Sequence, residues 1–396
     1  MPVSIQYIKK ARHLEGKRVL VRIDVNVPII KKKVLDDTRL KAIIPTIHYL
    51  LEKQARVILV GHLGRPEGKK KAALSLEPIA RRLSVLLGNK VAFLPDYKGI
   101  KVETAIQKMK PSTVVMLENI RFSQDEEGNK GTLAWYLSSL ADIYVNDAFS
   151  VSHRADASVV GIAPYLPSFG GLQLEKEIIG LEKITKTTKR PAILVIGGAK
   201  SETKIPVVKN FLNRADAILV GGALFNTYLF SLGYSMGNSL MDVSMSSAAK
   251  KYIGNKKVVK PIDVIVGTVD GKKYRCVSIT KKNKHLCKKN EAVLDIGPKT
   301  IVSFAKYIYD AQTIVWNGAM GYFEQMPYDV GTKSLARLIA ARSKGKAYGV
   351  IGGGETIQAM EQVAMAQYID LVSTGGGAML DFLSAKKLPG IEALVS

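Results

Sequence analysis

The stretch Ala347-Tyr-Gly-Val-Ile-Gly-Gly-Gly-Glu-Thr-Ile-Gln-Ala-Met360 predicts a buried strand, a tight turn and the start of a helix. Val350 and Ile351 end a short apolar run, and helical spacing begins at Thr356. The three glycines between them leave bare backbone N–H groups at a helix N-terminus, where an anion binds well. Glu355 follows at the lip of the turn, in a position to hold the cation of such an anion. For a single glycine, a plain tight turn is the favoured explanation. For three glycines with an acid behind them, a phosphate site and a plain turn are about equally favoured.

The length and composition indicate an intracellular globular protein of two domains. A chain of 396 residues exceeds what one hydrophobic core organises, and an apolar fraction of 47% is enough for real cores. No apolar run is long enough to span a bilayer, and residues 1–22 lack the apolar region of a signal peptide. Cys276 and Cys287 are the only cysteines and do not have metal-ligand spacing. We therefore expect a soluble protein of the reducing cytoplasm.

The formal net charge of +24 is large and includes lysine runs. They lie at Lys31 to Lys33, Lys69 to Lys71 and Lys281 to Lys284. These runs lack interleaved aromatic residues, so solvated surface is the favoured interpretation. Contact with nucleic acid and steering of an anionic substrate are the alternatives, and charge alone does not choose between them.

In the first half of the chain, short apolar runs end in polar residues and are followed by helical segments. The runs cover residues 18–23, 56–60, 113–117 and 143–145. Strands that alternate with helices indicate a parallel α/β sheet, whose ligands bind beyond the carboxyl ends of the strands. Cations gather at those ends: Arg22, Arg39, His62, Arg65, Arg121, His153 and Arg154. Arginine pairs its planar fork with carboxylate and phosphate oxygens, so this half predicts a site for a small polyanion.

The second half repeats the architecture with glycines at the strand ends. Apolar runs at 192–196, 217–220 and 313–316 lead into glycine turns, as do the later strands. The turns are Gly197-Gly198-Ala199-Lys200, Gly221-Gly222-Ala223, Asn317-Gly318-Ala319, Gly352 to Glu355 and Gly375 to Gly377. Small residues let a flat base and a phosphate chain approach the backbone, lysines add point charge, and Glu324 has the acceptors for ribose hydroxyls. Tight turns alone explain one or two such sites but not five.

Residues 172–184 read as one long amphipathic helix after Gly170-Gly171. We expect two Rossmann-like α/β domains with parallel sheets, joined by this hinge helix. The boundaries are 1–171 for the substrate domain, 172–190 for the hinge and 191–387 for the nucleotide domain. An arginine-lined sheet and a glycine-lined sheet on a hinge make a phosphotransferase arrangement, in which closure joins two anions and excludes water.

These motifs resemble the phosphoglycerate kinase family, and the resemblance covers essentially the whole chain. The matching blocks are Val21 to Pro28, Asp37-Thr-Arg39, His62 to Pro66, Leu117 to Phe122, Asn146-Asp-Ala-Phe149, His153-Arg154, Gly197 to Lys200, Trp316-Asn-Gly318, Gly352 to Gly354 and Ser373 to Gly377. The resemblance implies a monomeric, cytoplasmic glycolytic kinase that bends at its hinge. It would transfer a phosphoryl group reversibly from 1,3-bisphosphoglycerate to ADP, giving 3-phosphoglycerate and ATP. Residues 388–396 would pack back onto the first domain.

The resemblance also implies roles for particular residues. Arg39, Lys200 and Lys204 would be catalytic. The glycerate substrate would be bound by Asp24, Asn26, Arg39, His62, Arg65, Arg121, His153 and Arg154. The nucleotide would be bound by Gly198, Ala199, Lys204, Gly221, Gly222, Asn317, Glu324, Gly352, Gly353, Gly354, Glu355 and Thr356. Mg²⁺ would arrive with ADP or ATP and be held by Glu355, with no membrane or nucleic acid required.

The chain departs from the family pattern at three places. Glu355 stands where aspartate is usual, Ser201-Glu202-Thr203 replaces the common Val-Ser-x before the second lysine, and Ala319 replaces proline. The chemistry itself needs no general base, because the attacking carboxylate is ionised at neutral pH. Two other classes stay open: a different two-domain kinase for another small anion, and a non-enzymatic nucleic-acid-binding protein.

Overall fold

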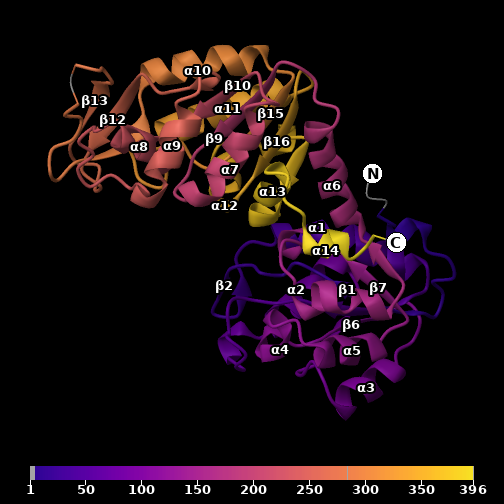
Figure 1. Cartoon of the computed structure of the whole chain (residues 1–396). Coiled ribbons are helices and arrows are strands. Elements are labelled where there is room, and N and C mark those ends of the chain that lie inside the picture. The colour runs from indigo at the N-terminus through magenta and orange to yellow at the C-terminus, as the bar shows by residue number, and fades with distance from the viewer. Residues whose placement is uncertain (1–4, 283, 396) are drawn as a thin grey trace. The chain divides into compact units, whose positions relative to one another are not determined.

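A computed structural model describes residues 5–282 and 284–395 (Figure 1). The chain divides into two compact units. The first comprises the described residues up to Ile178 together with those from Lys387 on, and the second is Ile179–Lys386. The boundary falls inside helix α6 (Leu172–Thr185). Among the described residues, no helix has the length and apolar character needed to cross a membrane.

The first unit is built on a parallel sheet with strand order β5-β6-β4-β1-β7-β8. Its strands are β1 (Arg18–Arg22), β4 (Arg56–Val60), β5 (Val91–Phe93), β6 (Val114–Met116), β7 (Ile143–Asn146) and β8 (Ser168–Gly170). The strands expected at 18–23, 56–60, 113–117 and 143–145 are present in this sheet. The three-residue strands β5 and β8 at its two edges were not predicted, because they are too short to give a periodic pattern.

Helices cover the first sheet. Apolar residues of α1 (Thr38–Glu52) and α2 (Glu77–Leu87) pack on alternate residues of β1, β4 and β6 in one core. Tyr144 of β7 is fully buried and donates to the carbonyl of Ser158 in the π-helical turn Ala157–Gly161. The remaining elements of the unit are the hairpin β2 (Ile29–Ile30) and β3 (Lys33–Val34), and the helices α3 (Ile100–Gln107), α4 (Gln124–Glu127), α5 (Gly131–Ser139) and α14 (Pro389–Glu392).

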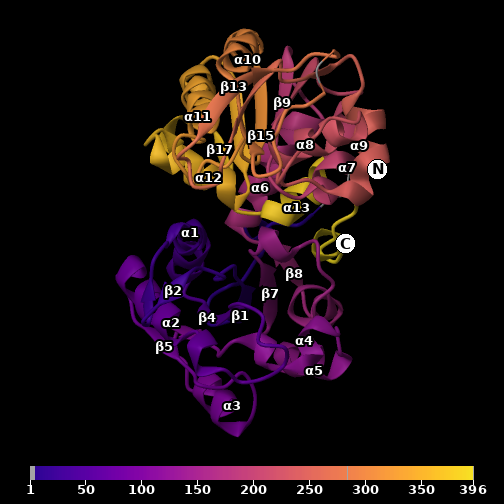
Figure 2. The same cartoon turned by 90° about the vertical axis from the view of Figure 1, so that its left-hand side faces the viewer.

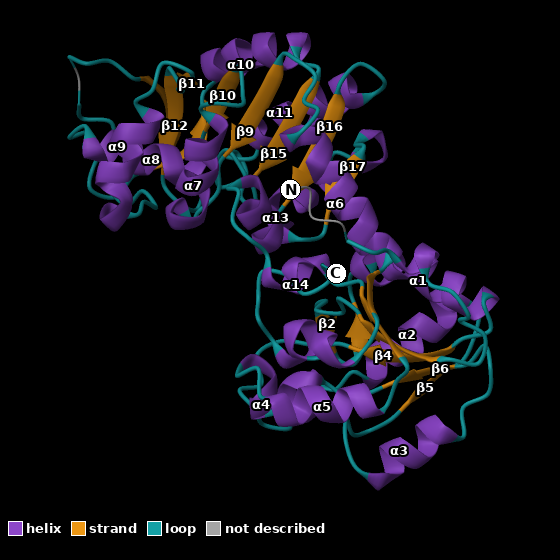
Figure 3. Ribbon diagram, turned by 45° about the vertical axis from the view of Figure 1, so that its right-hand side comes forward, coloured by secondary structure: helices purple, strands orange, loops and turns teal. Residues whose placement is uncertain are grey.

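The second unit has a large parallel sheet with order β11-β10-β9-β15-β16-β17 (Figure 3). Its strands are β9 (Ala192–Ile196), β10 (Ala217–Val220), β11 (Val258–Val259), β15 (Thr313–Asn317), β16 (Tyr348–Gly352) and β17 (Leu371–Ser373). A separate antiparallel sheet, order β13-β12-β14, is made of β12 (Asp263–Gly267), β13 (Tyr274–Ser278) and β14 (Ala292–Ile296). The fold class of two parallel-sheet α/β domains is confirmed, and this smaller sheet is an addition to it.

Helices lie on both faces of the large sheet, as Figure 2 shows. On one face α10 (Pro298–Asp310), α11 (Val330–Ser343) and α12 (Gly354–Gln362) enclose a core around the fully buried Trp316. On the other lie α7 (Ser201–Phe211), α8 (Gly222–Ser231), α9 (Ser246–Ile253) and α13 (Gly376–Leu383). The strands are buried on both faces, which explains why they read as unbroken apolar runs.

Buried carboxylates from distant segments cap several helices. Asp147, after β7, accepts from the first turn of α6, and Asp263 of β12 accepts from Lys299 and Thr300 at the start of α10. Asp295 of β14 accepts from Gly331 at the start of α11 over 2.7 Å. The first N–H groups of a helix have no partner within the helix, so these aspartates fix each helix start to the sheet.

Candidate active site

The first cluster of interest lies beyond the carboxyl ends of the first unit's strands. His62 follows β4, Asp24 follows β1, Arg39 begins α1 and Arg121 follows β6. Burial, followed by the positive charges of Arg22, Arg121, Arg154 and Arg39, lowers the pKa of His62 well below its ordinary value. Because charges act on this ring from several segments, the residues predicted to bind substrate are brought together as expected for one sheet edge.

Hydrogen bonds organise this edge. Arg39 Nη1 donates to both Asp24 oxygens, at 3.1 and 3.0 Å, and the Asn26 N–H donates to Asp24 Oδ1. Asn26 Oδ1 in turn accepts from the Gly64 N–H over 3.0 Å. Arg39 stays one-third exposed while Asp24 is buried. The pair therefore holds Arg39 at a place where it is partly open to solvent.

His62 is fixed in one tautomer. Arg22 Nη2 lies 2.9 Å from His62 Nδ1, and a guanidinium is a donor only, so Nδ1 accepts. The neutral ring then carries its proton on Nε2. Because the lowered pKa keeps the ring neutral at physiological pH, His62 presents one N–H donor at the cluster.

Arg22 itself corrects the sequence interpretation. Its place at the end of β1 groups it with the substrate cations, but it is fully buried. Its guanidinium donates to Ser158 Oγ and the Ile23 carbonyl besides facing His62. Arg22 is thus an internal brace that sets the His62 tautomer, and the sequence position could not show it.

The far side of the edge holds the remaining cations. Arg121 is almost fully buried, donates to the Gly64 carbonyl, and pairs with Glu127 at 3.3 Å and Asp156 at 3.5 Å. Arg154 pairs with the same Glu127 at 3.5 Å, and burial followed by the charge of Arg121 lowers its pKa. Arg65 is exposed and adds to that effect on Arg154, while His153 precedes Arg154 and is half-buried. Because these cations repel one another, an anion bound at these strand ends would be stabilised.

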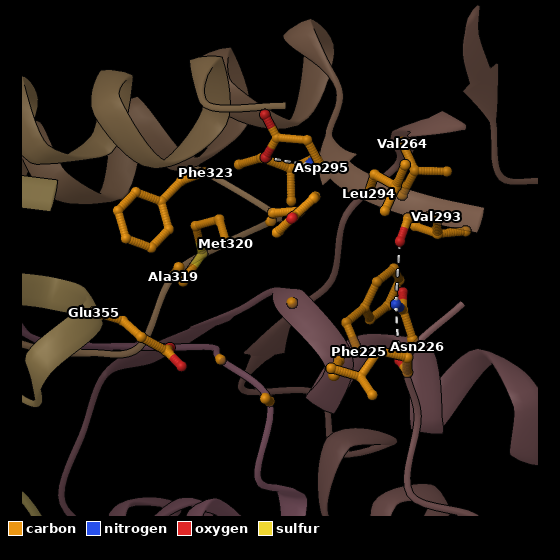
Figure 4. A pocket seen from close by; sticks show the side chains of 18 of the residues that line it. Phe225, Asn226, Val264, Val293, Leu294, Asp295, Ala319, Met320, Phe323 and Glu355 are labelled. Carbon is orange, nitrogen blue, oxygen red and sulfur yellow. Dashed lines mark hydrogen bonds between the residues drawn. The ribbon is translucent and has the colours of Figure 1, made fainter. Parts of the chain in front are cut away.

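The second cluster surrounds a cavity of about 380 Å³ in the second unit (Figure 4). Five residues predicted to bind nucleotide line it: Gly198, Ala199, Gly222, Glu324 and Glu355. Its remaining wall is mainly apolar and includes Phe225 of α8, Val264 of β12, Val293 and Leu294 of β14, and Met320 and Phe323 after β15. A mainly apolar cavity with a few polar groups suits a flat base with attached phosphates.

The glycines of this cavity are required by their surroundings. Gly198 and Gly222 have φ of +84° and +61°, and a Cβ on Gly222 would lie 2.7 Å from Gly198 N and 2.8 Å from the Ala319 carbonyl oxygen. A Cβ on Gly198 would lie 2.7 Å from Glu355 Oε2. Only glycine combines this conformation with so close a backbone approach. The turn glycines therefore expose backbone to whatever fills the cavity.

Lys204 connects two of the glycine turns. It is 8% exposed and donates to Asn317 Oδ1, while Asn317 Nδ2 donates to the Gly352 carbonyl over 2.7 Å. Burial lowers the pKa of Lys204 to about 8, against the opposing charge of Glu355. Lys204 is thus a buried cation whose pKa is close to physiological pH, and it lies among the turns that follow β9, β15 and β16.

The remaining residues predicted in the second unit, catalytic Lys200 among them, take three kinds of place. Lys200 is exposed at the N-cap of α7. Thr356 is buried, and its Oγ1 accepts from the Gly318 N–H over 2.6 Å, so it supports the turn after β15. The rest lie at strand ends without lining the cavity: Gly221 as the N-cap of α8, Gly352 at the end of β16, and Gly353 and Gly354 at the start of α12.

The carboxylates available to a metal are few. Across the described ranges 5–282 and 284–395, no three His, Cys, Asp or Glu side chains gather as a metal site. Glu355, exposed in the first turn of α12, is the acid at the glycine turns. A single carboxylate fits Mg²⁺, which keeps several waters and takes its other ligands from phosphates.

The apolar wall of the cavity was missed by sequence reasoning. Phe225 and Asn226 lie on α8, and Val264, Val293 and Asp295 come from the small antiparallel sheet. These segments are separated in sequence and have no motif of their own. Gly221-Gly222 before α8 was the one usable signal, since a helix that starts at a glycine turn places its first turns beside the ligand.

An arginine-rich strand edge in one unit and a glycine-lined nucleotide-sized cavity in the other define an α/β phosphotransferase. The family model described as phosphoglycerate kinase matches residues 8–386. The phosphoglycerate kinase of Thermosipho africanus is 44% identical over 390 residues, covering 97% of this chain and 96% of that protein. The phosphoglycerate kinase of Moorella thermoacetica is 43% identical, covering 97% and 98%. The chain therefore belongs to the phosphoglycerate kinase family.

Solved structures agree with this assignment. The phosphoglycerate kinase structure from Coxiella burnetii aligns with a TM-score of 0.84 at 36% identity, covering 99% of both chains. The one from Pyrococcus horikoshii aligns with a TM-score of 0.87 at 32% identity, covering 98% of both. Both support the two-domain α/β architecture expected from the sequence.

Proposed function

We propose that this chain catalyses reversible phosphoryl transfer from 1,3-bisphosphoglycerate to ADP, giving 3-phosphoglycerate and ATP. The observation that carries the proposal is that one unit has cation-rich strand ends and the other has a glycine-lined cavity. Glu355 lines this cavity, and its charge acts on the buried Lys204. The membership of the phosphoglycerate kinase family supports it.

In this proposal the first unit binds the glycerate. Arg121 and Arg154 meet its remote phosphate, Arg65 and His153 add charge and a donor at the rim, and His62 donates its Nε2–H to a substrate oxygen. Asp24 and Asn26 orient the hydroxyl and carboxyl end, and Asp24 keeps Arg39 in place until the reacting group arrives. Bidentate arginines give orientation as well as affinity, which converts binding into positioning.

The second unit binds the nucleotide. The base enters the apolar cavity beside Gly222, Glu324 accepts from the ribose, and the phosphates meet the backbone of Gly198, Ala199 and Gly352 to Gly354. Gly221, Asn317 and Thr356 hold these turns in shape. Glu355 would hold the Mg²⁺ of the nucleotide directly or through water, and the metal would supply charge neutralisation at the phosphates.

The transfer needs charge neutralisation more than proton chemistry. The attacking carboxylate of 3-phosphoglycerate is already ionised, so no general base is required. Arg39, Lys200 and Lys204 neutralise the three equatorial oxygens of the phosphoryl group in transit. In-line transfer also requires both ligands to meet, so the proposal includes closure of domains 1–171 and 191–387 on residues 172–190.

The proposal places the enzyme in the cytoplasm as a monomer. Its two cysteines, Cys276 and Cys287, are both free, as a reducing compartment requires. Sedimentation at assay concentration measures the oligomeric state, and a second sedimenting species would contradict the monomer.

A coupled assay tests the activity directly. ATP formation from ADP and 1,3-bisphosphoglycerate should be Mg²⁺-dependent, and Arg121→Ala should raise the KM for the glycerate without changing that for ADP. A panel of other carboxylate acceptors separates this function from that of a different small-molecule kinase. Turnover of another acceptor in preference to 3-phosphoglycerate would overturn the proposal.

A further inference from the structure

The first turn of α6 takes its hydrogen bonds from side chains of the first unit. The Leu172 N–H donates to Thr46 Oγ1 of α1 over 3.0 Å. The N–H groups of Gln173 and Leu174 both donate to Asp147 Oδ1, at 2.9 and 3.1 Å. A helix is ordinarily capped by its own N-cap side chain, but here that place belongs to Gly171.

The packing around this cap leaves little freedom. Asp147 is 1% exposed, and a Cβ on Gly171 would lie 2.1 Å from its Oδ1. Glycine at 171 thus allows the carboxylate to reach the helix amides. The cap is a closely packed contact between the carboxyl end of β7 and α6, the helix that contains the unit boundary.

The residue before Asp147 holds a second segment. Asn146 Nδ2 donates to the Gly390 carbonyl over 3.2 Å, and the Gly390 N–H donates to the Ser152 carbonyl over 2.8 Å. A Cβ on Gly390 would lie 2.6 Å from a Val159 methyl, so this segment is also closely fitted. The chain passes between the units twice, after Ile178 and before Lys387. Asn146 and Asp147, which are adjacent at the end of β7, therefore hold the chain near both of these crossings.

The phosphoryl-transfer roles proposed above do not use the Asn146-Asp147 pair. We propose that Asn146 and Asp147 are positioning residues of the reaction. They anchor both chain connections between the units to the carboxyl end of β7 in the first sheet. Transfer between ligands on separate units depends on where those connections start. A misplaced start costs rate while leaving each binding site intact. This inference rests on the proposed function, because it assumes that the reacting groups are carried by different units.

The electrostatics of Asp147 give the inference a separate readout. Burial raises the pKa of Asp147 to about 7, against hydrogen bonds from the Thr46 side chain and the N–H groups of Leu174 and Gln173. A second buried acid, Glu177, lies on α6 itself and accepts from Gln173 Nε2 over 3.2 Å. Because burial raises the pKa of Asp147 above that of a free aspartate, the protonated carboxyl is the form that folding favours. The anchor is therefore tight below about pH 7 and loosens as the carboxyl ionises.

The decisive variants are Asp147→Ala, which removes the acceptor of the helix amides, and Asn146→Ala. Each should lower kcat about 10- to 100-fold, the loss expected from misplacing reacting groups by about an ångström. The KM values for 3-phosphoglycerate and ATP should stay within about twofold, because no binding residue is touched. Asp263→Ala is the matched control, since Asp263 caps α10 inside the second unit in the same way. It should lower the Tm without changing kcat.

The pH dependence of kcat distinguishes positioning from simple stabilisation. The wild type should lose activity as pH rises through about 7, because Asp147 ionises, and Asp147→Ala should lack this step. Hydrogen exchange at the Gln173 and Leu174 amides should speed up over the same pH range in the wild type only, after correction for the intrinsic rate. These wild-type measurements hold even if a variant fails to fold.

Two results would overturn the inference. One is an Asp147→Ala enzyme with wild-type kcat and pH dependence. The other is an equal loss of kcat in Asp263→Ala, which would make any lost cap sufficient. If instead the coupled assay shows no phosphoglycerate kinase activity while the amide exchange behaves as expected, the proposed function fails and the anchor itself stands.

Discussion

Gly222→Ala is the sharpest test of the nucleotide cavity, because its cost can be worked out in two parts. The φ of +61° costs an alanine about 1–2 kcal/mol. The new methyl would also lie 2.7 Å from Gly198 N and 2.8 Å from the Ala319 oxygen, both backbone atoms that have to move. Overpacking of this kind costs about 1–3 kcal/mol. We expect the variant to lose about 2–5 kcal/mol of unfolding free energy in total.

Gly88→Ala is a matched control for the backbone term. Gly88 ends α2 with the same φ of +61°, and a Cβ added to it would have no heavy atom within 4 Å. It should lose only the conformational term of about 1–2 kcal/mol. The difference between the two variants therefore isolates the clash inside the cavity.

Urea unfolding and nucleotide titration measure the two effects. In a Trp135→Phe background, which removes the tryptophan of the first unit, the fluorescence of Trp316 follows the second unit separately. This matters because two units need not unfold together. Calorimetric titration should show ADP binding weakened about tenfold or more in Gly222→Ala, a loss of at least about 1.4 kcal/mol. It should be unchanged in Gly88→Ala. Equal destabilisation of both variants with intact ADP affinity would refute the reasoning.

Four further outcomes are expected. Arg39→Ala should lower kcat about 10³-fold in the coupled assay, by analogy with arginine fingers, and Arg39→Lys should restore only part of it; a change in KM alone would leave Arg39 a binding role. Glu355→Asp should shift the Mg²⁺ concentration for half-maximal rate several-fold and leave the KM for 3-phosphoglycerate unchanged, whereas unaltered metal dependence in Glu355→Ala would place the metal elsewhere. Because the pKa of Lys204 is about 8, kcat should fall as pH rises through 8 and its charge is lost, and Lys204→Arg should abolish that fall. Because His62 stays neutral, kcat/KM should show no step from its titration between pH 6 and 8, and a step that His62→Gln removes would contradict the neutral ring.

The strands and their order along the chain could be predicted because both sheets are buried on two faces. Such strands read as short apolar runs, and the polar or glycine residues after them mark the ligand edge. The runs 192–196 and 217–220 match β9 and β10 residue for residue. The small sheet escaped prediction because β13 is exposed along most of its length and lies among lysines, which gives no alternating pattern.

Side-chain partnerships were beyond the sequence. Arg22 and Arg39 looked alike as arginines of the first unit's ligand edge, yet one braces His62 from inside and the other stays at the surface on Asp24. What separates them is Ser158, a residue 136 positions away that supplies a buried acceptor for Arg22. The same is true of Asp147, whose partners on α6 are 26 and 27 positions away. Motifs place such residues at the right edge, and only the packed structure assigns their bonds.

The hydrogen bond from Asn146 to Gly390 joins residues 244 positions apart. During synthesis at about 5–20 residues per second, the ribosome would deliver Gly390 roughly 12–50 s after Asn146. The whole of Ile179–Lys386 emerges within that interval and is contiguous, so the second unit can fold while the first still lacks its last segment. Until then the Asn146 side-chain amide lacks the partner that Gly390 supplies, and Val159 lacks its contact with that segment. The nascent first unit thus passes through a long-lived incomplete state in the cell, one that chaperones or proteases can reach.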